Sequence, residues 1–327
     1  MARRPRRSIL CLSITVLFVF FLAYMAFCFS ARRASRTLTS SPVSVASEVF
    51  REGLNDSVCC RGVDGLELWG SATKWGSEHK VESAEACCLE CKAACTGPGD
   101  QCRCNTWVFC GNKEHCKDKF GECWLKKQND VLSPEVVSSG DHSMWTSGLV
   151  FAKGEGIFGL ETSQGTLRIK LLPDCAPRSV AYITELLGAR SCAGCHIVRA
   201  EGRGQFWDLK GDHVSHASFG PPYALIQGTL EADGIFFKEV PKEFCPSIKR
   251  GSVAWVGQGP EFFVSLANHH EWKRSYTVFG FVLPEDMEIA EKIASLPSKL
   301  DVWANVTVSV LEDPVSLRVV RVAGPGE

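Results

Sequence analysis

Apolar positions are distributed very unevenly along the chain. Residues 9–29 form a run of 21 uncharged, mostly apolar positions. At a rise of about 1.5 Å per residue, a helix of this length spans roughly the 30 Å hydrocarbon core of a bilayer. Residues 30–57 are rich in Ser, Arg, Thr and Val without helical period and are interpreted as a stalk. Beyond them the apolar runs are short, which predicts folded domains built from short elements.

The 9–29 segment is predicted to be a single membrane anchor. Four arginines precede it and three follow it, and this slight bias favours a cytosolic tail at residues 1–8. A cleaved signal peptide is the alternative, but its apolar core should be only about 7–15 residues long and end in small residues. This run ends in Phe27, Cys28 and Phe29. We therefore expect a single-pass type II membrane protein of the endoplasmic reticulum or Golgi, with its folded part in the lumen; the plasma membrane is the alternative location.

The cysteines favour an oxidising compartment. Of 17 cysteines, two lie in the apolar run, 11 lie between Cys59 and Cys123, and four follow. This density is typical of a disulfide scaffold. Zinc is the alternative, but the spacing of the cysteine pairs is irregular for a zinc ribbon. Because 11 is odd, one of these thiols stays free, pairs elsewhere or links two chains; the sequence does not determine the connectivity.

The charge balance and two glycosylation sequons narrow the expected partners and modifications. With 45% apolar and 22% charged residues the chain can build globular cores, and residues 51–327 carry a net charge of −7. An acidic ectodomain excludes nucleic acid as the expected partner, because phosphate binding needs a basic surface. Asn55-Asp56-Ser57 and Asn305-Val306-Thr307 are acceptor sequons, so Asn55 and Asn305 are candidate glycosylation sites.

Residues 58–150 combine a cysteine-bearing helix with short apolar strands. The helix is predicted over 82–91, strand-like segments over 105–110 and 121–126, and a closing Trp-Thr-Ser-Gly at 145–148. This order, with Cys-Asn-x-Trp at 104–107, resembles the PAN/apple module. The resemblance implies a small disulfide-rich α+β domain, with a five-stranded sheet crossed by one helix, that binds a protein or carbohydrate. The alternative is a domain that only spaces or dimerises the protein.

Residues 156–323 carry many short strands and two helices. The first helix follows Pro177 and places Val180, Ile183, Leu186 and Leu187 on one face, and the second covers 284–295. This pattern predicts a mainly β domain, a closed β-barrel capped by two helices. The expected strands are 157–161, 166–171, 223–227, 251–256, 262–266, 277–282, 306–311 and 317–322.

The order of motifs in this second region resembles the cyclophilin family of peptidyl-prolyl isomerases. Thr166–Leu171 with Ala176–Val180 is similar to the opening strand and helix start of that family, and Ala224–Gly228 to its glutamine-glycine segment. The further matches, in chain order, are Gly251–Trp255, Gly259-Pro260, Phe262–Val264, Glu271-Trp272 and Val278–Gly280. The resemblance implies a cyclophilin-like barrel that binds X-Pro segments of secretory proteins and needs no cofactor.

The resemblance also implies a set of site residues. Arg199 is the expected catalytic residue, and the expected substrate-binding residues are Leu225, Gln227, Val256, Glu261, Phe263, Trp272 and Tyr276. Several positions depart from the family pattern. Ala224 replaces a pocket phenylalanine, with Tyr223 beside it; Glu261 and Tyr276 replace a glutamine and a histidine; and a long insert includes residues 202–222. Glu261 beside Arg199 could form an ion pair, which would compete with the substrate for the guanidinium; the alternative is an open groove with Arg199 directed at Phe263.

Two remaining patterns, a C-x-x-C-H segment and a group of histidines, are interpreted as structural rather than as cofactor or metal sites. Cys192-Ala193-Gly194-Cys195-His196 matches the haem-attachment signature and contains a C-x-x-C redox pair. No second axial ligand or βαβ context accompanies it, so we expect a local disulfide or pairing with Cys175 or Cys245. His213, His216, His269 and His270 are expected to be surface residues rather than metal ligands. Three function classes follow: a lumenal prolyl isomerase, a non-catalytic module that binds a protein or glycan partner, and a dimerising spacer.

Overall fold

The computed structural model describes residues 59–98, 101–189, 192–232, 237–243 and 246–322, all within the compact unit Asp56–Glu327. The expected tail, anchor and stalk, together with Asn55, lie outside the described residues. Among the helices that are described, none is long and apolar enough to cross a membrane.

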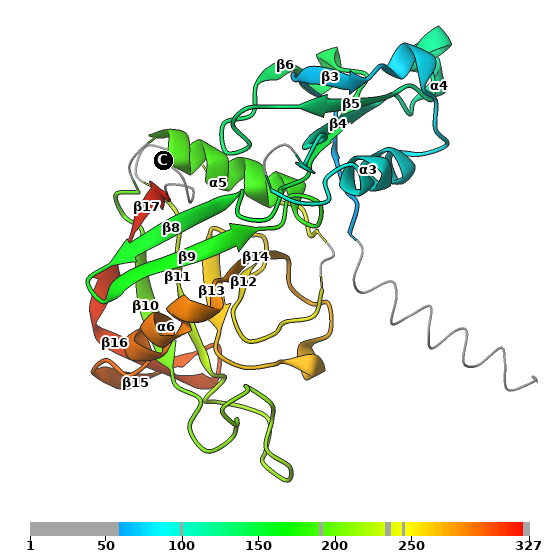
Figure 1. The fold of residues 1–327 in the computed structure, drawn as a ribbon. Coiled ribbons are helices and arrows are strands. Elements are labelled where there is room, and N and C mark those ends of the chain that lie inside the picture. Colours follow the sequence, from blue (N-terminus) through cyan, green and yellow to red (C-terminus); the bar gives the residue numbers. More distant parts are fainter. Residues whose placement is uncertain (1–58, 99–100, 190–191, 233–236, 244–245, 323–327) are drawn as a thin grey trace, which may run out of the picture. The chain divides into compact units, whose positions relative to one another are not determined.

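The larger sheet contains ten strands that follow one another through hydrogen bonds, in the order β15-β16-β10-β11-β13-β12-β14-β9-β8-β17 (Figure 1). No described pairing joins the two end strands, so the pairings do not supply the closed barrel that was expected. The strands are β8 (Ile157–Thr162), β9 (Gly165–Leu171), β10 (His196–Glu201), β11 (Leu225–Thr229), β12 (Ser252–Trp255), β13 (Glu261–Ser265), β14 (Val278–Val282), β15 (Ser298–Trp303), β16 (Val306–Ser316) and β17 (Arg318–Arg321).

Alternation and helical spacing explain how these segments form their elements. In β9 the side chains of Leu167, Ile169 and Leu171 are fully buried while their neighbours are half-buried, the period of two that a strand requires. The helix α5 (Pro177–Ala189) buries the apolar face predicted from its sequence. The second predicted helix is shorter than expected, since a 3-10 turn η6 (Pro284–Asp286) precedes α6 (Met287–Ile293).

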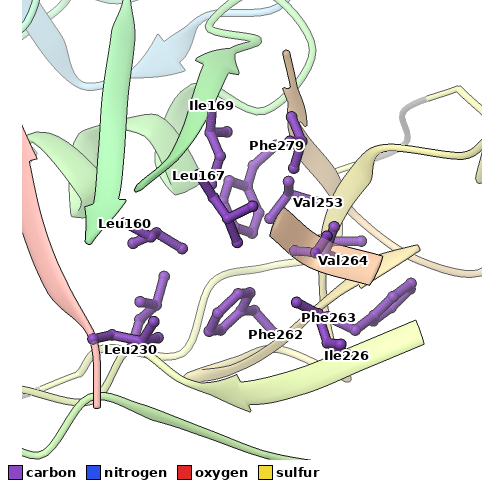
Figure 2. Close-up of a cluster of buried hydrophobic side chains, with 14 of the residues drawn as sticks. Leu160, Leu167, Ile169, Ile226, Leu230, Val253, Phe262, Phe263, Val264 and Phe279 are labelled. Atoms are coloured by element: carbon purple, nitrogen blue, oxygen red, sulfur yellow. The ribbon is translucent and has the colours of Figure 1, made fainter. Parts of the chain in front are cut away.

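The core of this sheet is made of inward-facing aliphatic and aromatic side chains. Figure 2 shows Leu160 and Ile169 from the first hairpin facing Phe262, Val264 and Phe279 from later strands. These five side chains are at most 1% exposed. Burying so much apolar surface is the main term that stabilises the domain, and it fixes the strands that carry the site described below.

The cysteine-rich region has the five-stranded sheet and helix that were expected. Its sheet order is β1-β7-β4-β5-β3, and a separate pair joins β2 to β6. Helix α3 (Ala84–Ala93) begins at Ser83, whose side chain accepts from the backbone N–H of Ala86 at 3.1 Å. The strands are β1 (Val63–Asp64), β2 (Leu66–Leu68), β3 (Ser71–Lys74), β4 (Thr106–Phe109), β5 (Cys123–Lys127), β6 (Val136–Ser139) and β7 (Thr146–Leu149); the short helices are α4 (Lys113–Cys116), η1 (Gly76–Glu78), η3 (Lys117–Lys119) and η4 (Gly140–His142).

Seven disulfides join cysteines in the part of the chain that is described. Cys59 pairs with Cys175, which accounts for the odd count of the cysteine-rich region, and Cys192 pairs with Cys195 as a local disulfide. The latter bond uses both sulfurs that haem attachment would need. The other five pairs are Cys60–Cys88, Cys87–Cys123, Cys91–Cys104, Cys95–Cys102 and Cys110–Cys116. Cys245 lies outside the described residues.

Candidate functional site

Three adjacent strands bring the main predicted site residues into one row. Arg199 of β10 lies opposite Gln227 of β11, and Gln227 lies opposite Phe263 of β13. Residues directly opposite in neighbouring strands share one face of the sheet. The row therefore places a guanidinium, an amide and an aromatic ring side by side, as the sequence predicts.

A bulge in β10 sets the direction of the Arg199 side chain. Ile197 pairs with Gly228 but Arg199 pairs with Gln227, so one extra residue is inserted into β10 between these two positions. A Cβ atom on Gly228 would lie 2.1 Å from the carbonyl oxygen of His196, so only glycine fits against the bulged strand. Bulges of this kind turn a side chain toward a site, and here that side chain is Arg199.

The row forms one side of a cavity of about 300 Å³. Seven of the eight predicted active-site and pocket residues line it, and Glu261 is adjacent, with its Oε2 3.4 Å from Gln227 Nε2. The sequence analysis noted Tyr223 only as a neighbour of Ala224 and missed the rest of the wall, Trp303, Val306 and Val308. The lining residues are Arg199, Tyr223, Leu225, Gln227, Val256, Phe263, Trp272, Tyr276, Trp303, Val306 and Val308.

Aromatic rings make up most of the apolar wall. The ring centre of Phe263 lies 5.8 Å from that of Trp272 and 5.1 Å from that of Tyr276, both in edge-to-face geometry. Trp272 is placed by the 3-10 turn η5 (His270–Trp272). Burial raises the pKa of Tyr276, so its hydroxyl is a neutral donor at physiological pH. Such a wall suits an apolar ring with a polar group at its edge.

Arg199 is held by a carboxylate other than the candidate Glu261. Its Nε donates to Glu201 Oε1 at 2.8 Å, and its Nη1 donates to Gln227 Oε1 at 3.0 Å. Its Cζ also lies 5.6 Å from the ring of Tyr223 and 5.9 Å from that of Trp303. The carboxylate that pairs with Arg199 is Glu201 and not the candidate Glu261, because Glu201 lies two residues further along the same strand and its side chain is on the same face. Glu261 instead lies beside the Gln227 amide.

The insert contacts the pocket through a chain of rings. Trp207 contacts both His213 and His269, and His269 stacks on Trp272 with ring centres 3.6 Å apart. His269 is fully buried, so its expected place on the surface was wrong; its Nε2 lies 2.8 Å from the Tyr223 carbonyl oxygen. Among the described residues no group of His, Cys, Asp or Glu is suited to hold a metal ion.

Trp303, Val306 and Val308 belong to a hairpin of which only the second strand was predicted from the sequence, over residues 306–311. Strands β15 and β16 pair from Trp303–Val306 outward around the turn Ala304-Asn305, where both residues have positive φ. Two-residue hairpin turns with positive φ at both positions favour Asn-Gly or Asp-Gly, and Ala304-Asn305 is not such a pair, so the turn had no clear sequence signal. Lys299-Leu300-Asp301-Val302 alternates polar and apolar residues, the period of two of a strand, so β15 was a strand that the sequence allowed to be predicted; its Leu300 and Val302 are exposed.

Comparison with known proteins identifies the region that carries this site. The family model described as cyclophilin type peptidyl-prolyl cis-trans isomerase/CLD matches residues 157–313. No curated protein matches the chain significantly.

A comparison with solved structures finds two cyclophilins. A cyclophilin type peptidyl-prolyl cis-trans isomerase from Cryptosporidium parvum is 15% identical, covers 52% of this chain and 99% of its own, and has a TM-score of 0.37. Cyclophilin AquaCyp293 from Hirschia baltica is 15% identical, with 52% and 76% covered and a TM-score of 0.36. On the evidence of the family model, the chain carries a cyclophilin-type peptidyl-prolyl cis-trans isomerase domain over residues 157–313.

Proposed function

We propose that this domain catalyses cis/trans isomerisation of X-Pro peptide bonds in secretory-pathway proteins. The observation that carries the proposal is the row of Arg199, Gln227 and Phe263 on one wall of a single cavity. Phe263 with Leu225 forms an apolar surface for the prolyl ring, and the two polar groups face the amide. The pocket needs no cofactor for this reaction.

The chemistry requires only that the twisted amide be bound better than either planar form. Resonance makes the barrier about 18–20 kcal/mol, so uncatalysed rotation takes tens to hundreds of seconds. A guanidinium N–H directed at the prolyl nitrogen favours the pyramidal nitrogen of the twisted state. The bonds to Glu201 and Gln227 involve two of the five N–H groups of Arg199. Another N–H group of Arg199 would contact the substrate, and its contribution counts only if it is stronger in the transition state.

A proline-tetrapeptide exchange assay with the full chain tests the proposal, with Arg199→Ala beside the wild type. We expect isomerisation to accelerate with wild type and to fall at least tenfold with Arg199→Ala. Arg318→Ala is the matched control, because Arg318 also pairs with a strand glutamate, Glu161, and belongs to β17, which does not contribute to the cavity wall. If the folded wild-type chain gives no acceleration, the enzyme proposal is wrong.

A second candidate function, binding without catalysis, is favoured by one observation. The Glu201 carboxylate, only 1% exposed, pairs with Arg199 and offsets its charge inside the site. A neutralised guanidinium stabilises developing electron density less than a free one, while the aromatic wall still binds an apolar ring. A chain that binds a proline peptide in titration without accelerating its isomerisation would favour this candidate.

We also propose that the chain is held in the membrane by residues 9–29, with the folded part in the lumen of the endoplasmic reticulum or Golgi or outside the plasma membrane. The seven disulfides support the lumenal or extracellular placement of the folded part, since such bonds persist in oxidising compartments. Asn305 is exposed at the tip of a hairpin, where a glycan would fit. Glycopeptide mass spectrometry of the chain made in a secreting cell tests the lumenal placement, since Asn305 and Asn55 carry glycan only if they reach the lumen. Carbonate extraction of the membranes tests the anchor, because only a membrane-spanning chain stays in the pellet.

The cysteine-rich region is proposed to be a PAN/apple-like module for a protein or carbohydrate partner. Its five-stranded sheet with α3 agrees in architecture with that reading. The alternative, a spacer that dimerises through an odd cysteine, loses support because Cys59 pairs with Cys175 of the same chain. A monomer on non-reducing gels would remove that alternative.

A further inference from the structure

The carboxylate of Glu201 connects two parts of the pocket. Its Oε1 accepts from Arg199 Nε at 2.8 Å, and its Oε2 accepts from the backbone N–H of Tyr223 at 2.6 Å. The first contact lies within β10, and the second reaches Tyr223, two residues before β11 begins. One side chain therefore fixes both the guanidinium and the point where the chain returns from the insert to the sheet.

This arrangement is costly unless both oxygens are bonded. The Glu201 side chain is 1% exposed and that of Arg199 is 12% exposed. A buried carboxylate without partners loses its hydration without compensation. Here one oxygen has a charged donor and the other has a backbone donor, so the carboxylate is stable only while Arg199 and Tyr223 keep their present positions.

Tyr223 links the Glu201 carboxylate to the apolar wall of the cavity. Its ring lies 5.6 Å from Arg199 Cζ and 6.0 Å from the ring centre of Trp272. Its carbonyl oxygen is the partner of the buried His269. Fixing the Tyr223 backbone therefore fixes a ring that faces both the guanidinium and the apolar wall.

We propose that Glu201 is a positioning residue for Arg199, holding the guanidinium in line with the reacting amide and coupling it to the insert through Tyr223. The proposal rests on the isomerase function proposed above. It gives the long insert a role: residues 202–222 end at a backbone group that helps to set the orientation of the catalytic arginine.

Glu201→Gln tests this role because it keeps the shape and changes the hydrogen bonding. A carboxylate accepts from two donors, whereas an amide offers one oxygen and one NH2. The NH2 would face either Arg199 Nε–H or the Tyr223 N–H, donor against donor. We expect the guanidinium to be released from its fixed orientation, with kcat for a proline tetrapeptide falling about tenfold and KM changing little, as for an interaction realised in the transition state.

Two further variants separate positioning from a simple effect on folding. Glu201→Asp keeps two acceptor oxygens on a shorter stem and should recover part of the lost kcat. In an Arg199→Ala background, Glu201→Gln should cause no further loss, because it acts through Arg199. Glu161→Gln is the control: it removes the same charge from a strand glutamate that pairs with Arg318 at 2.7 Å.

A readout independent of catalysis is the ¹⁵N resonance of Arg199 Nε in the full chain, assigned by its loss in Arg199→Ala. We expect this resonance to shift, and its N–H to exchange faster with water, in Glu201→Gln but not in Glu161→Gln. An unchanged resonance and unchanged kcat in a folded Glu201→Gln chain overturn the inference. If Glu201→Gln does not fold, Glu201→Leu, which has no acceptor for Arg199 or Tyr223, takes its place, and a folded Glu201→Leu chain with the wild-type resonance and kcat overturns the inference as well. If the wild-type chain has no isomerase activity, the proposed function is wrong. The ¹⁵N resonance of Arg199 Nε then still shows whether Glu201 positions the guanidinium.

Discussion

Gln227 presents its amide oxygen to Arg199 Nη1 at 3.0 Å and its amide nitrogen to Glu261 at 3.4 Å. The two neighbours together assign the orientation of the amide, because a guanidinium can only donate and a carboxylate accepts. The glutamine is thus fixed between a donor and an acceptor, in the middle of the row that faces the cavity.

Replacing this amide should reduce activity with little loss of fold. Gln227→Leu keeps nearly the same volume at a position that is 7% exposed but leaves Arg199 Nη1 without this acceptor. A lost hydrogen bond to a charged group costs about 1.5–3 kcal/mol, so we expect kcat/KM to fall about tenfold or more in the tetrapeptide assay. Gln258→Leu, at an exposed glutamine, should be silent; equal activity of Gln227→Leu and wild type would contradict this account.

Trp303 should contribute to binding more than to the chemical step. It lines the cavity and lies over Arg199, while its own Nε1 donates to Asp301 at 3.0 Å. A cation–π contact is worth about 0.5–2 kcal/mol, and Trp303→Ala also removes an apolar wall. We expect calorimetric titration with a proline peptide to show an affinity loss of about tenfold. Val302→Ala changes the neighbouring residue, which is 65% exposed and points away; a similar loss there would assign the effect to the hairpin as a whole.

Gln227 and Phe263 could be predicted because each lies in a motif that matches the family pattern, Ala224–Gly228 and Phe262–Val264, whereas the residues around Arg199 do not keep the family pattern. The neighbours of Arg199 were harder to predict. Glu201 and Glu261 are both plausible partners in the sequence, and only the register of β10 with β11 and the bulge decide between them. The alternation Arg199-x-Glu201 on a strand was a usable signal.

Trp303 could not be assigned to the pocket in the same way. It lies more than 100 residues from Arg199 in the chain and reaches it because β16 pairs with β10. Long-range contacts in the folded domain determine that pairing, and the local strand propensity of either segment does not specify it. The same holds for Cys59, whose partner Cys175 lies 116 residues away.

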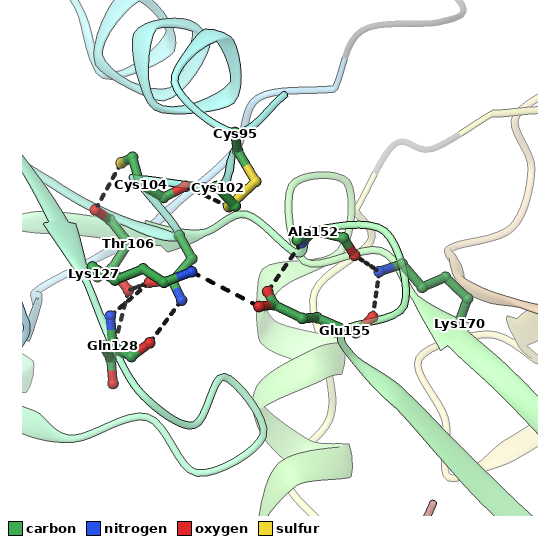
Figure 3. Close-up of polar contacts among 10 residues, drawn as sticks. Cys95, Cys102, Cys104, Thr106, Lys127, Gln128, Ala152, Glu155 and Lys170 are labelled. Atoms are coloured by element: carbon green, nitrogen blue, oxygen red, sulfur yellow. Dashed lines mark hydrogen bonds and ion pairs between the residues drawn. A yellow bond between two sulfur atoms is a disulfide. The ribbon is translucent and has the colours of Figure 1, made fainter. Parts of the chain in front are cut away.

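Lys170 should make stability depend on pH on the alkaline side. Figure 3 shows its ammonium directed at the carbonyl oxygens of Ala152 and Glu155. Burial lowers the pKa of Lys170 from 10.5 to about 8. Between these two values the unfolded chain keeps the proton and the folded chain releases it, so the free energy of unfolding rises with pH in this window.

Urea unfolding at pH 7.5, 8.5 and 9.5 would measure this slope. We expect the wild type to gain stability relative to Lys170→Met as the pH rises above about 8, because the variant has no proton to release. Lys299→Met is the control, since Lys299 is exposed on β15. Parallel stability curves for wild type and Lys170→Met would contradict the assignment.

Glu243 should stabilise the start of α5, the longest helix of the domain. Its carboxylate accepts from the backbone N–H groups of Arg178 and Ser179 at 2.9 and 3.1 Å and from the Ser179 hydroxyl at 2.7 Å. The first N–H groups of a helix have no partner within it, and a carboxylate there also interacts favourably with the positive end of the helix dipole. Glu243 is 5% exposed, so water does not readily replace it.

Removing this carboxylate should therefore lower stability without touching the pocket. Glu243→Ala removes the acceptor of three donors, the N–H groups of Arg178 and Ser179 and the Ser179 hydroxyl, and we expect the free energy of unfolding to fall by about 1–3 kcal/mol. Denaturant unfolding measures the loss, and Glu239→Ala, at an exposed glutamate of the same segment, should leave stability nearly unchanged. Since Arg199, Gln227 and Phe263 are carried by β10, β11 and β13, the folded Glu243→Ala chain should keep the wild-type kcat; a variant that stays stable but loses activity would instead link this segment to the site.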